Sequence, residues 1–184
     1  CNASFSSPWV KYDVKTACSA TALTTITEGF ESSTALQTPQ CWFNTEAVLA
    51  QSIVSAVRTG SRGVVMEGTV GSSRFLVSPK LDANIDGIFT FYTKSVTGTT
   101  PTNIVVGTVE DPNALDTFLQ YQNIASIGST WAQNTVNFSG NSNNHRYIAI
   151  KHVSTSATDR FAVDDITYLP ALLDVENFLE ENKI

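Results

Sequence analysis

The chain has 184 residues, of which 42% are hydrophobic and 15% are charged, and its formal net charge is −6. This length suits one core domain with short flanking segments, and the balance of apolar and uncharged polar residues excludes disorder over most of the chain. Lys and Arg number 11 against 17 Asp and Glu, with no block of like charges, so the sequence predicts no nucleic-acid partner.

No run of about 18 apolar residues occurs, so no transmembrane segment is predicted. Residues 1–9 lack the basic start and apolar core of a signal peptide. We therefore expect either a cytosolic protein or a piece cut from a longer secreted precursor. A neutral polar surface suits proteins outside the cell, although cytosolic β proteins share this composition.

Three cysteines, Cys1, Cys18 and Cys41, lie in the first quarter of the chain without C-x-x-C spacing. This arrangement does not favour zinc or thioredoxin-like chemistry. A disulfide fits better, and three pairings are possible. The odd cysteine indicates a partner upstream of this chain.

Short β-rich runs separated by turn residues recur along the chain. They are Gly63–Val70, Arg74–Ser78, Gly87–Lys94, Asn103–Glu110, Thr117–Ile124, Trp131–Phe138, His145–Val153 and Arg160–Leu169. Their spacing predicts an all-β sandwich or barrel.

The alternation of residue types indicates where two of these strands lie. Phe89 and Phe91 share one face of their strand while Thr90 and Lys94 point the other way, as in a half-buried strand. The run Arg146–Lys151 is apolar on both faces, so we expect a central strand.

Helical periodicity occurs in two places. Glu46–Arg58 fits one helix or two strands, and Leu172–Asn182 is an acidic segment typical of a tail or linker.

Two acidic clusters flank the predicted domain, Glu28-Gly29-Phe30-Glu31 at its start and Asp164-Asp165 on its last strand. The first and last strands of an antiparallel sandwich are commonly neighbours, and carboxylates that meet there repel one another unless they are protonated or bridged. A calcium ion with oxygen ligands would bridge them. The alternative is that these acids are exposed, cap turns, or pair with Lys80 or Arg160.

Catalytic patterns are weak. His145 and His152 are seven residues apart on one predicted strand, so they point to opposite faces and cannot approach one metal together. For a glycosidase-like pair only Glu110 with Asp111 or Asp116 qualifies, and solvated loop acids explain these residues better. The sequence therefore predicts a protein that is not an enzyme.

Sugar binding, in which exposed aromatic rings stack on pyranose rings, is the main alternative to a passive role. The candidates are Tyr121, Tyr92 and Phe118, and we favour Tyr121 because its neighbours are polar. Trp131 and Trp42 are expected to pack inside the protein.

Six motifs occur in an order found in one group of bacterial domains. They are E-G-F-E, P-Q-C-W, R-F-L-V-S-P-K-L-D, W-A-Q-N-T-V-N-F-S-G, H-R-Y-I-A-I-K-H and D-R-F-A-V-D-D-I-T-Y. Over roughly Thr24 to Leu169 the chain resembles the cleaved-adhesin and choice-of-anchor J group. These domains are related in architecture to MAM domains and jelly-roll carbohydrate-binding modules, and they occur in secreted Bacteroidetes proteins.

The resemblance implies a structural calcium held by Glu31 and by Asp164 or Asp165. Glu28 stands where many members carry aspartate, which leaves its role open. The family often has an Asp/Gly-rich stretch after C-W, but this chain has Phe43–Ala47, so a ligand from that region is in doubt.

The two ends resemble other modules. Residues 1–20 look like the end of a fibronectin type III module or a linker, and residues 171–184 are similar to the segment before a type IX secretion sorting domain. In such tandem arrangements the closing cysteine often lies near the C-W element, which implies a Cys18–Cys41 disulfide.

We therefore expect an antiparallel jelly-roll β-sandwich over residues 21–170, stabilised by calcium, in a secreted, cell-surface protein. The expected function is that of a non-catalytic adhesin module that binds a glycan or another surface partner. The alternative is a stalk or accessory domain beside a type IX secretion signal, with the secretion machinery as partner and no ligand of its own.

Overall fold

The computed structural model describes residues 22–45, 48–51, 55–68, 70–96, 102–154, 156 and 159–171. These residues form eleven β-strands and one short 3-10 turn, η1 (Leu115–Thr117). The strands are β1 (Ile26–Glu28), β2 (Phe43–Asn44), β3 (Val48–Gln51), β4 (Gly63–Glu67), β5 (Ser73–Val77), β6 (Gly87–Ser95), β7 (Thr102–Val109), β8 (Leu119–Ile127), β9 (Ala132–Asn137), β10 (Tyr147–Val153) and β11 (Arg160–Pro170). The eight predicted strands correspond to β4 through β11.

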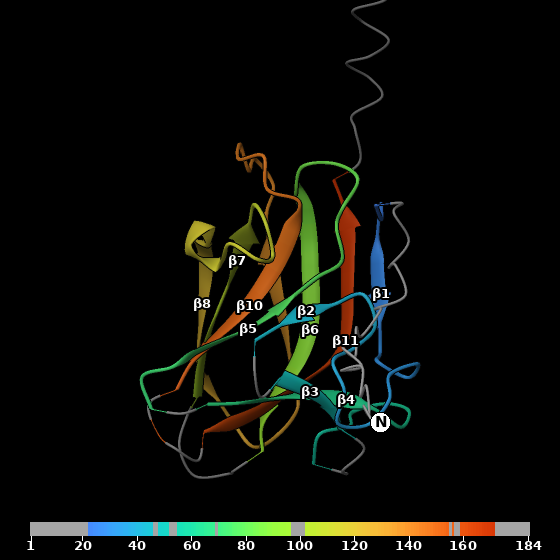
Figure 1. Ribbon diagram of the computed structural model, residues 1–184, viewed down its shortest axis with the longest axis vertical. Helices are drawn as coiled ribbons and strands as arrows, with labels where there is room; N and C mark the ends of the chain where they lie inside the picture. Colours follow the sequence, from blue (N-terminus) through green and yellow to red (C-terminus); the bar gives the residue numbers. More distant parts are fainter. Residues whose placement is uncertain are drawn as a thin grey trace, which may run out of the picture.

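The strands form two antiparallel sheets. One has five strands in the order β2-β5-β10-β7-β8, and the other has six, in the order β3-β4-β11-β6-β9 with β1 also paired to β11. Figure 1 shows β7, β8 and β10 on one side of the molecule, and β6, β11 and β1 on the other. The fold is the predicted all-β sandwich of jelly-roll type.

The core lies between the sheets because each strand turns alternate side chains inward. Phe89 and Phe91 are fully buried, as their alternation predicts, and they meet Ile148 and Ile150 of the opposite sheet in one apolar cluster. The strand β10 lies between β5 and β7, which confirms the prediction that it is central.

The last strand, β11, changes its neighbour halfway along. Its first half pairs with β4, its second half pairs with β1, and its other edge pairs with β6 throughout. The change falls at Asp164 and Asp165, where the register to β6 shifts and Asp165 has a positive φ of 48°. The first and last of the described strands are therefore neighbours, as expected.

Several predicted features lie outside the described residues. These are the fibronectin-like segment 1–20, the helix at Leu172–Asn182 and, apart from Ala171, the linker 171–184. Within Glu46–Arg58 the described part contains the strand β3. No helix in the described part has the length and apolar character needed to cross a membrane.

Candidate ligand-binding site

The outer face of the five-stranded sheet carries a second apolar cluster, separate from the core. A row of small side chains crosses its middle, because Val77 pairs with Ala149 and Ala149 pairs with Gly107. Phe43 pairs with Val77 at one end of this row. At the other end the Phe118 ring lies over Gly107, where an added Cβ would come within 2.7 Å of it. Aromatic rings thus flank a row of small side chains.

These rings meet edge to face. Phe43 and Tyr147 have ring centroids 6.0 Å apart at 88°, and Phe75 and Phe118 have centroids 5.5 Å apart at 74°. The ammonium group of Lys151 lies 5.6 and 5.5 Å from the last two ring centroids. Edge-to-face contacts fix the rings and leave Phe43, Phe118 and Tyr147 half-buried rather than covered.

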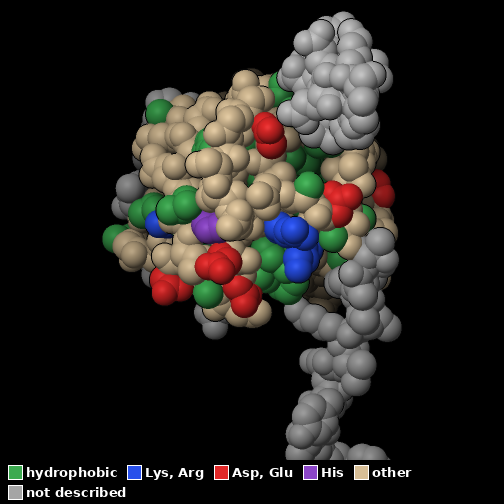
Figure 2. All heavy atoms as spheres, turned by 90° about the horizontal axis from the view of Figure 1, so that it is seen from above, with side chains coloured by type: hydrophobic (Ala, Val, Ile, Leu, Met, Phe, Trp, Pro, Cys, Tyr) green, Lys and Arg blue, Asp and Glu red, His purple; other side chains and the backbone are tan. Residues whose placement is uncertain are grey.

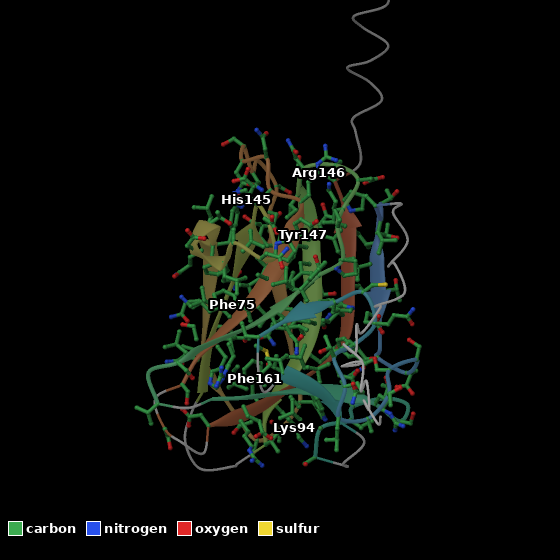
Figure 3. All side chains as sticks on the ribbon, in the orientation of Figure 1. Phe75, Lys94, His145, Arg146, Tyr147 and Phe161 are labelled. Atoms are coloured by element: carbon green, nitrogen blue, oxygen red, sulfur yellow. The ribbon has the colours of Figure 1, made fainter. Side chains whose placement is uncertain are left out.

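A pocket of about 780 Å³ opens at one end of this face and is lined by Phe43 and Tyr147. Its polar lining includes Lys80, Arg146, Glu110, Asp111, Asn113 and Asn144. Figure 3 places Arg146 and Tyr147 together at the upper end of the molecule. Figure 2, which looks onto that end, shows basic and acidic side chains on two sides of a hydrophobic patch. The volume is within the range of small-molecule sites, and the lining is more polar than in most of them.

The acidic side of the pocket is an ordered connection between β7 and β8. The Asp111 carboxylate accepts hydrogen bonds from the Asn113 backbone N–H at 2.8 Å and from its side-chain amide at 3.0 Å. The Thr117 hydroxyl donates to the Ala114 carbonyl at 2.6 Å and accepts from the Glu110 N–H at 3.2 Å. The connection therefore holds its polar groups in fixed positions.

The phenol of Tyr147 stays protonated in this setting. Burial raises its pKa above 10.0, and the negative charge of Asp111 raises it further. The hydroxyl can therefore donate a hydrogen bond to a ligand over the whole physiological pH range.

The three aromatic residues predicted to bind sugar do not form one platform. Tyr92 is on β6 in the other sheet, where the Arg58 guanidinium stacks on its ring at 3.5 Å. Tyr121 is 38% exposed on the edge strand β8, and its ring contacts Phe138 at a centroid distance of 4.7 Å. Phe118 alone belongs to the outer-face cluster.

Sequence reasoning missed Phe43 and Tyr147 as a pair. Tyr147, Ala149 and Lys151 alternate along β10 and so share its outer face. This alternation in the sequence could have indicated that Tyr147 lies on that face. That Phe43 packs on this face follows only from the pairing of β2 with β5.

The predicted calcium ligands gather around the loop that precedes β4. The Glu31 carboxylate accepts from the Ser61 backbone N–H at 2.8 Å and from its hydroxyl at 2.7 Å. Asp165 pairs with the Arg58 guanidinium at 2.5 Å and accepts from the Thr59 hydroxyl at 2.6 Å. One loop thus links the two acidic clusters.

Asp164 is fully buried beside this loop. Burial raises its pKa from 3.8 to about 6. Hydrogen bonds from the backbone N–H groups of Arg58 and Asp165 oppose this rise. Asp164, Asp165 and Glu31 thus all accept hydrogen bonds from the loop that precedes β4.

The fourth predicted ligand, Glu28, points elsewhere. Its carboxylate accepts from the Phe30 backbone N–H at 2.5 Å and from the Trp42 indole N–H at 3.4 Å. Trp42 packs on Phe30, with ring centroids 5.6 Å apart. Glu28 therefore fixes a turn and an indole. Among the described residues no three Asp, Glu, His or Cys side chains are placed to hold a metal ion.

The predicted Cys18–Cys41 disulfide involves Cys18, which lies outside the described residues. The predicted packing of Trp42 is observed, whereas Trp131 is half-buried, with the Lys94 ammonium 5.4 Å from its ring centroid.

No family model and no curated protein matches the sequence. Solved structures do match the fold. The K2 cleaved adhesin domain of Lys-gingipain is 19% identical with a TM-score of 0.65, over 78% of this chain and 98% of that domain. The K1 domain, from Porphyromonas gingivalis W83, is 18% identical with a TM-score of 0.64, over 80% and 98%.

A third similar structure is the CBM22-1 xylan-binding domain from Paenibacillus barcinonensis Xyn10C. It is 17% identical with a TM-score of 0.57, over 83% of this chain and 99% of that domain. At these identities the likeness establishes a shared fold, which agrees with the architecture expected from the motifs.

Proposed function

We propose that this chain is a non-catalytic, extracellular binding module, and that it binds a glycan in the pocket beside Phe43 and Tyr147. The observation that carries the proposal is a pair of half-buried aromatic rings that line a pocket together with acids, amides and cations. Apolar faces of sugar rings stack on aromatic side chains, and carboxylates and amides exchange hydrogen bonds with sugar hydroxyls.

The fold supports this proposal by analogy. A structure with the same architecture is named a xylan-binding domain, and others are named adhesin domains. The argument from the pocket is independent of that analogy, because it rests on the chemistry of the lining residues.

A binding role fits the pocket better than catalysis does. A glycosidase needs two carboxyl groups on opposite sides of the bond to be broken. Glu110 and Asp111 are neighbours in sequence on one loop, so they approach a ligand from one side. His152 is buried away from solvent, against the ring of Phe161.

Calcium binding is a second part of the proposal. It is supported by the hydrogen bonds that tie Glu31, the buried Asp164 and Asp165 to one loop, and it requires their carboxylates to move closer together than they lie in this structure. Oxygen ligands of this type suit calcium. Because Arg58 pairs with Asp165, the ion would bind only after the guanidinium moves away.

The test for glycan binding is a glycan array followed by calorimetry with the best ligand. Tyr147→Ala removes the stacking ring and should lower the affinity about tenfold or more. Tyr147→Phe keeps the ring and should retain most of the affinity. Tyr121→Ala, on the edge strand outside the pocket, is the matched control and should leave the affinity unchanged.

The proposal fails if no glycan binds the folded protein, or if Tyr147→Ala and Tyr121→Ala behave alike. Absence of any glycan ligand would favour the alternative, an accessory domain that contacts its neighbours or the type IX secretion machinery.

A further inference from the structure

The pocket contains two cations that no carboxylate neutralises. The ion pairs among the described residues involve Arg58 and Arg160, so Lys80 and Arg146 have no acidic partner in that part of the chain. Both line the pocket beside Tyr147. Lys151, by contrast, lies over two aromatic rings.

The unpaired cations face a pocket that also holds acids. Glu110 and Asp111 belong to the β7–β8 connection, whereas Arg146 directly precedes β10 and Lys80 follows β5. Neither acid forms an ion pair with either cation among the described residues. Charges of opposite sign are therefore held in separate parts of one pocket, with Phe43 and Tyr147 as the apolar surface.

We propose that the ligand in this pocket is an acidic sugar, a uronic acid residue within a largely neutral glycan. A uronic acid carries its carboxylate on one edge of the pyranose ring and a pair of neighbouring hydroxyls on the opposite edge. With the ring against Tyr147, the carboxylate meets Arg146 and Lys80 while the hydroxyls meet Asp111 and Glu110. This inference rests on the proposed glycan-binding function and specifies its ligand.

The two cations have different parts in this recognition. The Arg146 guanidinium is half-buried and offers a planar pair of donors that matches a carboxylate, so it fixes the ligand's orientation. Lys80 is exposed and adds attraction without fixed geometry.

Densely charged polyanions fit the pocket less well. The chain has a formal net charge of −6, and two acids share the pocket with the two cations. Repulsion from these groups disfavours a polymer with an anionic group on every sugar, whereas one carboxylate among neutral sugars meets only the cations.

The test uses the intact chain and matched pairs of ligands. Uronate-containing oligosaccharides, such as glucuronic-acid-substituted xylo-oligosaccharides, are compared by calorimetry with the same compounds after reduction of the carboxylate to an alcohol. We expect the acidic member to bind about tenfold more tightly at low salt. Arg146→Gln should bring the ratio of the two affinities close to one, and Lys80→Gln should reduce it less.

Lys94→Gln is the control, because it removes the same charge from the other sheet, beside Trp131. It should leave the affinity ratio unchanged. Equal binding of acidic and reduced ligands, or an unchanged ratio in Arg146→Gln, overturns the inference and leaves glycan binding intact. Failure of both ligands and of the whole array overturns the proposed function as well.

Discussion

The buried Asp164 carboxylate accepts a hydrogen bond from the backbone N–H of Arg58 at 2.8 Å, although 106 positions separate the two residues. The same carboxylate accepts from the N–H of Thr59 at 3.3 Å. These bonds attach the loop before β4 to β11 at the place where β11 exchanges β4 for β1. The Asp164 side chain thus accepts backbone hydrogen bonds at the place where β11 is paired with neither β4 nor β1.

The first prediction concerns the pH dependence caused by Asp164. In the folded protein its pKa is raised from 3.8 to about 6, so the folded state holds a proton that the unfolded chain has already released. Its contribution therefore favours folding below pH 4 and is lost as the pH rises through 6. Denaturant unfolding in EDTA at pH 4 to 7 should give a stability difference between wild type and Asp164→Asn that shrinks with rising pH.

Asp164→Asn also places an amide group where three backbone N–H groups point, which should cost about 1–3 kcal/mol. Asp116→Asn, at an exposed acid of η1, serves as the control and should change neither stability nor its pH trend. A constant difference between wild type and Asp164→Asn at every pH would contradict the assignment.

The second prediction concerns His152, whose contribution to stability changes with pH in the direction opposite to that of Asp164. His152 is fully buried, its two ring nitrogens have no hydrogen-bond partner among the described residues, and burial lowers its pKa below 6.5. Arg74 lowers the pKa further, while Asp159 opposes the shift. As the pH falls below 6.5 the unfolded chain takes up a proton that the folded protein resists, so this residue destabilises the fold under acid.

His152→Leu should remove the loss of stability that His152 causes at acidic pH. The stability of the variant relative to wild type, measured by thermal unfolding between pH 7 and pH 5, should increase as the pH falls. If wild type and variant keep a fixed difference over this range, His152 does not cause the acid sensitivity.

The third prediction isolates the contact between Glu31 and the loop. Gly60 and Gly71 both have positive φ, 66° and 76°, so alanine is strained at either position by about 1 kcal/mol. A Cβ at Gly60 would overlap the Glu31 carboxylate, whereas one at Gly71 would meet nothing within 4 Å. Gly60→Ala should therefore lower the melting temperature more than Gly71→Ala. Equal shifts would mean that the Glu31 contact adds no stability.

The fourth prediction tests calcium. If the ion binds at Glu31, Asp164 and Asp165, excess EDTA lowers the melting temperature and added calcium restores it, because a ligand that binds only the folded state stabilises that state. Asp165→Ala should abolish the difference. An unchanged melting curve in EDTA would remove calcium from the proposal and leave the hydrogen bonds to the loop as the role of these acids.

The β-rich runs and the turn residues between them were sufficient to predict β4 to β11, alternation predicted the buried face of β6, and an apolar run predicted the central place of β10. The strands β1, β2 and β3 are only two to four residues long, and such short segments form strands because a neighbouring strand pairs with them. The usual topology of antiparallel sandwiches led to the correct expectation that the strand with Glu28 and the strand with Asp164 are adjacent.

The candidate site was harder to predict than the fold. Tyr92 is a candidate because it is an aromatic residue that could stack on a sugar, but the Arg58 guanidinium stacks on that ring. Phe43 and Tyr147 meet because β2, β5 and β10 are adjacent in one sheet. Such a meeting depends on the register across three strands, which spacing along the chain does not reveal.

The position of β11 also affects when the protein can fold. This strand is the last one described, yet β1, β4 and β6 all pair with it. During synthesis on a ribosome, a chain that does not yet include residues 160–170 lacks the strand that joins the others. The larger sheet can therefore be completed only when the end of the domain emerges, although β3 can pair with β4, and β6 with β9, before that moment.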